Sequence, residues 1–358
     1  MKKIKIFTSK NYLPKGHGYV EILYPFWGIL PDNPPYRNTN RYENFVDIAR
    51  KLFEIVDDPD DADIFLLPAD LKKYYANDNF QQLNEIVDIS NSFKKKILIF
   101  NHSDKNIPIY VKNAITFRTS IYKSQKRKQD NLLPAWPVDF LKKYNNSELI
   151  IRNKREKPVI GFCGNATPRY HKSGKRKLYD TIVRKFPKSP IFMRFEHNTW
   201  LRNRIIQSLS NSSEIHTNFE IMDGFFAGIK NSNEEWNENE IENARLNYYN
   251  NLIGSDYVLS VRGEGNYSFR FYETLCCGRI PIFIDTDTIL PFEKWINWND
   301  HCLKIKYSEI NKIAEKVRKF HNKISNEGFH KMQIINRELW EKWLSPEGFF
   351  SNLFRHID

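Results

Sequence analysis

The chain has 358 residues and a formal net charge of +12, and 41% of its residues are hydrophobic and 15% aromatic. This composition is that of a globular protein and excludes an intrinsically disordered chain. No segment approaches the roughly 20 continuous apolar residues that a membrane helix needs. The length favours two domains of about 150 residues each over a single core.

The first half of the chain alternates short apolar runs with helical periods. The expected elements are a strand over 3–7, a helix over 41–55, a strand over 63–67, a helix over 80–93 and a strand over 97–100. Such alternation predicts βαβ units and a parallel sheet. Residues 9–35 are a long first loop rich in proline, glycine and aromatic residues, and loops of this kind are often functional.

The second half repeats the alternation after the polar segment 142–157, which is the predicted linker. The expected strands are 158–163, 191–195, 257–261, 280–284 and 303–305, and the expected helices are 175–186, 199–209, 240–252, 309–324 and most of 329–354. We therefore predict one domain over 1–150, a second over 151–328, and a helical tail over 329–358 that packs back on the first domain.

The N-terminus reads as the first strand. It lacks the apolar stretch and small-residue cleavage site of a signal peptide, so we expect a cytoplasmic protein. The cysteines show no C-x-x-C spacing, which favours reduced core thiols over a metal site or disulfides. They are Cys163, Cys276, Cys277 and Cys302.

Basic residues gather in three short runs, 123–128, 152–157 and 172–177. The runs are scattered and belong to no recognisable nucleic-acid module. A solvated or anion-attracting surface is therefore favoured over nucleic-acid binding, and a peripheral association with anionic membranes is compatible with the charge.

The segment 257–298 carries the most informative motif. A buried strand leads into the turn Arg262-Gly263-Glu264-Gly265, and a helix opens at Ser268. This order presents backbone N–H groups to a phosphate in α/β folds. Arg262 and Arg270 flank the turn, and Glu273 lies one helical turn beyond Arg270 on the same face. We interpret these groups as a sugar-nucleotide site, with the diphosphate held by the arginines and amides and the ribose by Glu273.

Each of these residues also has a structural interpretation. Arg262 can form a surface salt bridge, Arg270 and Glu273 can form an intrahelical ion pair, and Ser268 can simply cap its helix. The sequence Asp285-Thr286-Asp287 imitates a metal-binding Asp-x-Asp, but it follows a strand where a variable turn is expected. We therefore predict no metal site.

The motif resembles the exostosin pattern of glycosyltransferase family 47. The matching residues are Arg262-Gly263, Ser268-Phe269-Arg270-Phe271, Glu273, Leu275, Ile280-Pro281, Leu290-Pro291-Phe292 and Ile296-Asn297-Trp298. Weaker matches are Asp58-Pro59, Ala62-Asp63-Ile64-Phe65, Asp130 with Pro134, and Gly164 with Arg176, which is a third candidate phosphate ligand. The resemblance covers roughly residues 40 to 325 with gaps.

The resemblance implies an α/β protein of the GT-B type, in which two Rossmann-like doubly wound domains face an interdomain cleft. It implies an inverting reaction without a metal cofactor. The donor would be a UDP-sugar carrying glucuronic acid, xylose, galactose or a similar sugar, and the acceptor would be a glycan. The first domain would bind the acceptor and the second the nucleotide sugar.

An inverting reaction needs a base near the acceptor hydroxyl. Asp70 after the strand 63–67 is our first candidate, with His102 and Asp104 after the strand 97–100 and His17 in the first loop as alternatives. The aromatic residues Trp27 and Tyr36, in or beside that loop, are candidate acceptor contacts.

Two other functions stay open at this point. A non-catalytic subunit could keep the fold and stabilise a partner transferase, and it would bind nucleotide without turnover. A basic nucleic-acid-binding protein would instead show salt-sensitive binding to RNA or DNA and no affinity for UDP.

Overall fold

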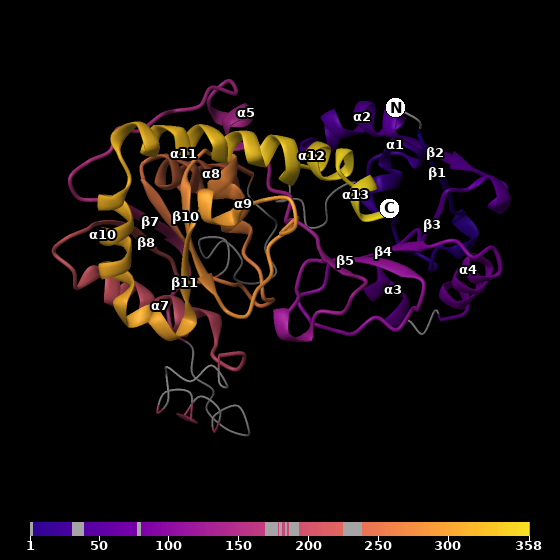
Figure 1. Ribbon diagram of the computed structural model, residues 1–358, viewed down its shortest axis with the longest axis horizontal. Coiled ribbons are helices and arrows are strands. Elements are labelled where there is room, and N and C mark those ends of the chain that lie inside the picture. The colour runs from indigo at the N-terminus through magenta and orange to yellow at the C-terminus, as the bar shows by residue number, and fades with distance from the viewer. Residues whose placement is uncertain are drawn as a thin grey trace. The chain divides into compact units, whose positions relative to one another are not determined.

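The computed structural model describes residues 3–30, 39–76, 80–168, 193–224 and 238–357, and the single positions 178, 181, 182 and 185. The chain forms two compact units (Figure 1). Unit 1 comprises Met1–Trp136, Ile289–Phe292 and Glu341–Asp358, and unit 2 comprises Pro137–Thr288 and Glu293–Trp340. This division differs from the predicted boundaries, because residues 137–150 and 329–340 belong to unit 2.

Unit 1 is built on a six-stranded parallel sheet with the order β2-β1-β3-β4-β5-β6. Its strands are β1 (Ile4–Phe7), β2 (Phe53–Val56), β3 (Ile64–Leu66), β4 (Ile97–Asn101), β5 (Ala114–Arg118) and β6 (Asp130–Leu132). Its helices are α1 (Tyr24–Trp27), α2 (Glu43–Leu52), α3 (Leu71–Ala76), α4 (Phe80–Ser92), α12 (Pro346–Ser351) and α13 (Phe354–Ile357).

Alternate residues of the unit 1 strands pack on opposite faces of the sheet, as the period of two requires. Ile97 and Ile99 of β4 join the cluster that contains Leu83 of α4. Phe100 of the same strand packs against Phe350 of α12, with ring centroids 6.3 Å apart. Helices therefore cover both faces, which explains why these strands are continuous apolar runs.

Two parts of the family pattern serve packing in unit 1. Asp130 is fully buried and pairs with Arg118 at 3.2 Å. Phe292, in the segment Leu290-Pro291-Phe292, packs its ring against Phe349 at a centroid distance of 5.8 Å. These matches are therefore explained by the core of unit 1.

Unit 2 is built on a five-stranded parallel sheet with the order β11-β10-β9-β7-β8. Its strands are β7 (Val159–Gly164), β8 (His216–Ile221), β9 (Tyr257–Ser260), β10 (Ile280–Asp285) and β11 (Leu303–Lys306). Its helices are α5 (Phe140–Tyr144), α7 (Asn198–Ser210), α8 (Glu238–Ile253), α9 (Phe269–Cys276), α10 (Ile313–Lys323) and α11 (Asn326–Leu339).

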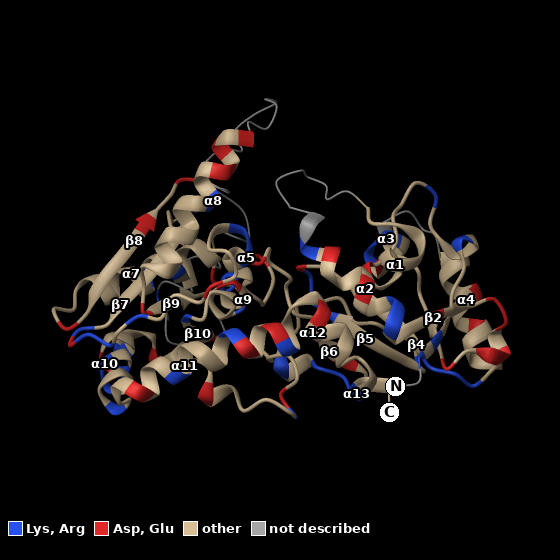
Figure 2. Cartoon of the chain, turned by 90° about the horizontal axis from the view of Figure 1, so that it is seen from above, with Lys and Arg blue, Asp and Glu red and all other residues tan. Residues whose placement is uncertain are grey.

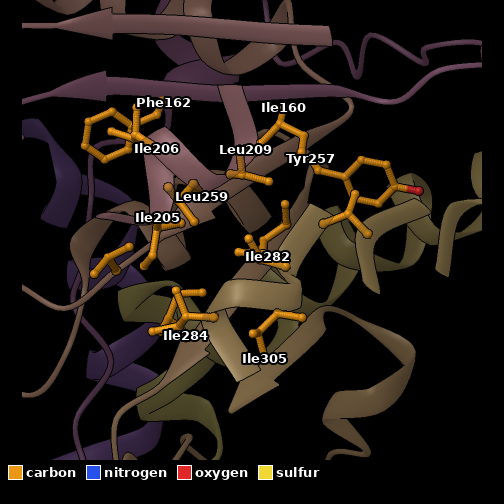
Figure 3. Packing of buried hydrophobic residues seen from close by; sticks show 14 of the residues in the cluster. Ile160, Phe162, Ile205, Ile206, Leu209, Tyr257, Leu259, Ile282, Ile284 and Ile305 are labelled. Atoms are coloured by element: carbon orange, nitrogen blue, oxygen red, sulfur yellow. The ribbon is translucent and has the colours of Figure 1, made fainter. Parts of the chain in front are cut away.

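The core of unit 2 again follows the alternation of its strands. Tyr257 and Leu259 of β9 belong to the large cluster that includes Ile205 of α7, where side chains of strands and helix interdigitate (Figure 3). Val258 of β9 joins a second cluster with Leu141 of α5. That contact places α5 in unit 2 and explains why the predicted linker 142–157 does not mark the boundary.

The fold class predicted from the sequence is confirmed: two doubly wound parallel-sheet units followed by C-terminal helices are the parts of a GT-B fold. All four cysteines are free and buried, as expected for core thiols. Acidic and basic residues are dispersed over both units (Figure 2). Among the described helices, none is sufficiently long and apolar to cross a membrane.

Several predicted elements need correction. The helix predicted over 41–55 ends at Leu52 and is followed by β2, because its last apolar residues fit the period of a strand equally well. Strands β5, β6 and β8 were not predicted. Residues 193–195 form a turn and not the end of a strand over 191–195. Most of the helix predicted over 175–186 lies outside the described residues.

His321 in α10 gives a testable pH dependence of stability. Its side chain is fully buried, Nδ1 lies 2.9 Å from the Tyr257 hydroxyl, and Nε2 lies 2.7 Å from the carbonyl of Arg155. Burial lowers the pKa of His321, so below the ordinary histidine range the unfolded chain binds the proton better than the folded one. Stability contributed by the neutral ring is therefore present above that range and is lost as the pH falls.

We expect His321→Gln to flatten the decrease in the free energy of unfolding between pH 7.5 and 5, by at most about 1.4 kcal/mol per pH unit, the limit for one proton. Urea unfolding at a series of pH values measures this slope. His216→Gln, which changes an exposed histidine of β8, is the matched control. Equal slopes in His321→Gln and in the wild type would contradict the prediction.

Candidate functional site

The candidate site lies where the strand order of the unit 2 sheet reverses. β7 pairs with β9 on one side and with β8 on the other. Gly164 ends β7, and the turn that starts at Arg262 follows β9. In open parallel sheets, ligands bind outside the carboxyl ends of the strands at this switch point. The topology therefore brings the sequence motif to the edge where such folds bind ligands.

Arg270 in the first turn of α9 points back onto the end of β7. Its Nη2 donates to the carbonyl of Cys163 at 2.6 Å, and its guanidinium carbon lies 4.3 Å from the ring centroid of Phe162. Gly164 has a φ of +145°, and a Cβ added there would lie 2.9 Å from Nη2. The described partner of Gly164 is thus Arg270, whereas Arg176, which we had grouped with Gly164, lies outside the described residues.

Arg262 is buried and holds the loop before α7. Its guanidinium donates to the carbonyls of Met193 and Glu196, and only 7% of the residue is exposed. Its own carbonyl accepts from Nη2 of Arg202 at 3.1 Å. The surface salt bridge considered for Arg262 is therefore not what this residue makes.

Arg202 in α7 completes a cluster that the sequence did not reveal. Its Nη1 donates to the carbonyl of Asn165, which follows β7, at 3.1 Å. Burial, and then repulsion from Arg270 and Arg262, lowers the pKa of Arg202 to about 9, although Glu264 partly offsets this. No spacing or composition signal marks Arg202, because a single arginine within a helix normally lies on a solvated face.

The three guanidinium groups have capacity for a further ligand. The Nε atoms of Arg202, Arg262 and Arg270 are all buried, and none has a hydrogen-bond partner within the described part of the chain. Three cations held close together repel one another, and a bound anion relieves that repulsion. Guanidinium groups bind phosphate by charge-assisted and often bidentate hydrogen bonds. The cluster is therefore suited to an anionic ligand with several oxygens.

Glu273 is connected to α8 and does not simply pair along its own helix. Its carboxylate accepts a hydrogen bond from the hydroxyl of Tyr248. Burial raises the pKa of Glu273, in spite of the Tyr248 hydrogen bond and the charge of Arg270, which lower it. The carboxyl thus lies near the arginine cluster with part of its hydrogen-bonding capacity unused, and its contact with a ribose stays a prediction.

Gly263 and Ser268 were expected to offer backbone or side-chain groups to a phosphate or to cap the helix. The Gly263 N–H donates to the carbonyl of Tyr267 at 2.8 Å, so the structure gives it a partner other than the predicted phosphate. Ser268 occupies the N-cap position of α9 with an extended backbone, and its side chain makes no capping hydrogen bond.

The two aspartates of Asp285-Thr286-Asp287 have local partners. Asp285 accepts from the backbone N–H of Thr288 at 3.1 Å and lies 3.2 Å from Nζ of Lys304. Asp287 pairs with Arg194 at 2.9 Å. Over the described ranges, no group of three or more His, Cys, Asp or Glu side chains is arranged to hold a metal ion.

Two of the base candidates in unit 1 are in direct contact. Asp70 follows β3, His102 follows β4, and Oδ2 of Asp70 lies 2.6 Å from Nδ1 of His102. Glu21, which the sequence analysis did not consider, lies on the other side of the ring, with Oε1 3.6 Å from Nε2. Asp104 is exposed, and the described contacts of Asp70 and His102 do not include it.

The charges of this cluster shift the pKa values of Asp70 and His102. Burial alone would raise the pKa of Asp70, but the hydrogen bond and charge of His102 lower it. Burial alone would lower the pKa of His102, but Glu21 and Asp70 raise it.

The structure describes one of the two predicted acceptor contacts, Trp27. Trp27 is partly exposed, and its carbonyl accepts from the hydroxyl of Tyr19 at 2.6 Å. His17 lies in the same first loop, and Tyr36 lies outside the described residues.

Two doubly wound units, one of them with an arginine cluster at its switch point, are the parts of a GT-B glycosyltransferase. Comparison with family models identifies the same class, since residues 38–320 match the Exostosin GT47 domain. Because this match covers most of the chain, the protein belongs to the exostosin family, glycosyltransferase family 47. The predicted family is confirmed.

Two curated relatives match over shorter stretches. The Exostosin-1 homolog of Caenorhabditis elegans is 37% identical over 71 residues, which are 20% of this chain and 19% of that protein. Exostosin-1 of Drosophila melanogaster is 29% identical over 106 residues, which are 30% of this chain and 13% of that protein. The matched stretch is thus less than a fifth of the length of either relative.

Two solved structures show weak similarity. A glycosyltransferase from Rickettsia africae ESF-5 has a TM-score of 0.37 and 12% identity, with 99% of this chain and 98% of that chain covered. TarM has a TM-score of 0.31 and 10% identity, with 73% of this chain and 55% of that chain covered.

Proposed function

We propose that this protein transfers a sugar from a UDP-sugar to a hydroxyl of a glycan acceptor, with inversion at the anomeric carbon and without a metal cofactor. The transferred sugar would be glucuronic acid, xylose, galactose or a similar sugar. The proposal rests on family membership and on one observation, the cluster of Arg202, Arg262 and Arg270 at the switch point of unit 2. Action in the cytoplasm stays a prediction.

The chemistry of the leaving group explains why the cluster matters. As the bond to the sugar breaks, negative charge develops on the nucleoside diphosphate, and fixed cations lower the energy of that state. Arginines that main-chain carbonyls already hold in place need little reorganisation to bind this developing negative charge. Such a set can replace the divalent cation that other transferases use.

A panel of UDP-, GDP- and CMP-sugars, with and without manganese, tests the proposal by thermal unfolding. A ligand at one hundred times its Kd stabilises the folded state by about 2.7 kcal/mol. We expect one UDP-sugar to raise the Tm to the same extent with and without manganese, and UDP release to follow. Stabilisation that needs manganese would overturn the metal-independent mechanism. Nucleotide binding without any turnover would favour the non-catalytic subunit.

Two variants test the assignment of the site. Arg270→Ala and Glu273→Ala should each weaken UDP binding about tenfold or more, since each removes a hydrogen-bonding group with a charge. Both should still unfold in a single cooperative transition. Lys319→Ala, which removes an exposed cation of α10, is the control. Calorimetric titration with UDP measures the affinities, and unchanged values in both site variants would remove the assignment.

A further inference from the structure

A second polar cluster lies in unit 1 at the carboxyl end of its sheet. Glu21 begins a short 3₁₀ helix between β1 and β2, Asp70 follows β3, and His102 follows β4. β1, β3 and β4 are consecutive neighbours in the sheet, so parallel pairing brings together residues that are far apart in sequence. β1 and β3 also flank the point where the strand order of this sheet reverses, the position at which such sheets bind ligands.

Asp70 fixes the orientation of the His102 ring. Its Oδ2 lies 2.6 Å from Nδ1 of His102 and accepts the backbone N–H of His102 at 2.7 Å. Its Oδ1 accepts the backbone N–H of Lys72 at 3.1 Å. A carboxylate in this position holds the proton of the neutral ring on Nδ1 and leaves the lone pair on Nε2.

Nε2 of His102 is buried and has no hydrogen-bond partner among the residues that the structure describes. Oε1 of Glu21 lies 3.6 Å away, which is longer than a hydrogen bond. The same oxygen accepts from the Tyr42 hydroxyl at 3.3 Å, which fixes the carboxylate beside the ring. Nε2 therefore keeps one unused lone pair, to which a ligand hydroxyl can donate once the groups that cover it move aside.

We propose that His102 is the general base of the transfer reaction, that Asp70 is its positioning residue, and that Glu21 stabilises the imidazolium as it forms. The inference rests on the function proposed above. The acceptor oxygen forms its bond to the anomeric carbon, and the bond from that carbon to the diphosphate oxygen breaks, with the electron pair leaving on UDP. The hydroxyl proton moves to Nε2 of His102 and is later released to water.

The charged groups that face His102 set its pH dependence. Burial and Lys72 oppose the protonated ring, but Glu21 and Asp70 favour it, and the net effect raises the pKa of His102 above the ordinary histidine value. The base is active only when neutral. We therefore expect kcat/KM to rise with pH, with a midpoint above the ordinary pKa of histidine. In Glu21→Gln, this rise should occur at lower pH.

The test combines kinetics with NMR on the full chain. UDP release is measured for the UDP-sugar that stabilises the protein most, with water alone and with methyl glycosides of glucose, galactose and glucuronic acid as acceptors. The imidazole ring signals of His102 are assigned with His102→Gln and titrated in the wild type, Glu21→Gln and Asp70→Asn. His216→Gln is the control for the loss of a histidine.

We expect His102→Gln to lower the rate about 10²- to 10⁴-fold while UDP binding stays unchanged and unfolding stays cooperative. The kinetic limb and the NMR titration of His102 should coincide and should shift together in Glu21→Gln. A His102→Gln enzyme that keeps its rate would overturn the inference, and so would a His102 that titrates at or below the ordinary value. A wild type that releases no UDP from any sugar nucleotide would instead overturn the proposed function, and the titration separates the two cases.

Discussion

Arg202→Gln should weaken UDP binding about 10- to 100-fold, because a hydrogen bond to a charged group is worth roughly 1.5–3 kcal/mol. Without nucleotide, the variant should melt no lower than the wild type. Burial and the neighbouring arginines depress the pKa of Arg202 to about 9, which means that its charge destabilises the folded state without ligand. Removing the charge relieves that cost, which offsets the loss of the two hydrogen bonds from Arg202 to the carbonyls of Asn165 and Arg262.

Calorimetric titration with UDP at pH 7.5 measures the affinities. Arg318→Gln, which removes a partly exposed arginine paired with Glu214, serves as control. Equal affinity of Arg202→Gln and the wild type at pH 7.5 would exclude Arg202 from the site.

The sequence predicted best the strands that are continuous apolar runs. Burial alone did not suffice, because β5 is buried along its whole length but contains a threonine and an arginine, and it was missed. β4 and β10 are continuous apolar runs flanked by turns and helices, and both were predicted. β2 and β8 lie at the edges of their sheets, and β8 alternates threonine, asparagine and glutamate with few apolar residues. Edge strands with mixed exposure lack the periodic signal, because only part of their surface meets the core.

Those residues of the candidate site that lie close together in the sequence were identified from the sequence. Arg262, Arg270 and Glu273 lie within a dozen residues of one another, so a strand, a turn and a helix suffice to relate them. Arg202 reaches them only because side chains of α7 share a core cluster with those of β7 and β9, and that packing depends on the whole core. Glu21 was missed for the same reason. It meets His102 only through the pairing of β1, β3 and β4.

Gly164→Ala should both destabilise the protein and weaken UDP binding. The φ of +145° at Gly164 is almost exclusive to glycine, and forcing another residue into such a region costs about 1–3 kcal/mol. The new Cβ would also lie 2.9 Å from Nη2 of Arg270. A guanidinium at the end of a flexible side chain can move away at little cost in stability, but it would leave the carbonyl of Cys163 and the arginine cluster.

Gly16→Ala separates these two effects. Gly16 also has a positive φ, of +72°, but nothing lies within 4 Å of an added Cβ. The Gly16→Ala variant should therefore be less stable than the wild type by about 1 kcal/mol, and its affinity for UDP should be unchanged. Urea unfolding and UDP titration of both variants give the comparison. If Gly164→Ala loses stability but binds UDP as the wild type does, the position of Arg270 at the end of β7 is not what binds the diphosphate. The site would then have to rest on Arg262 and Arg202; the guanidinium of Arg262 is held by the carbonyls of Met193 and Glu196, which are not adjacent to Gly164 in the chain.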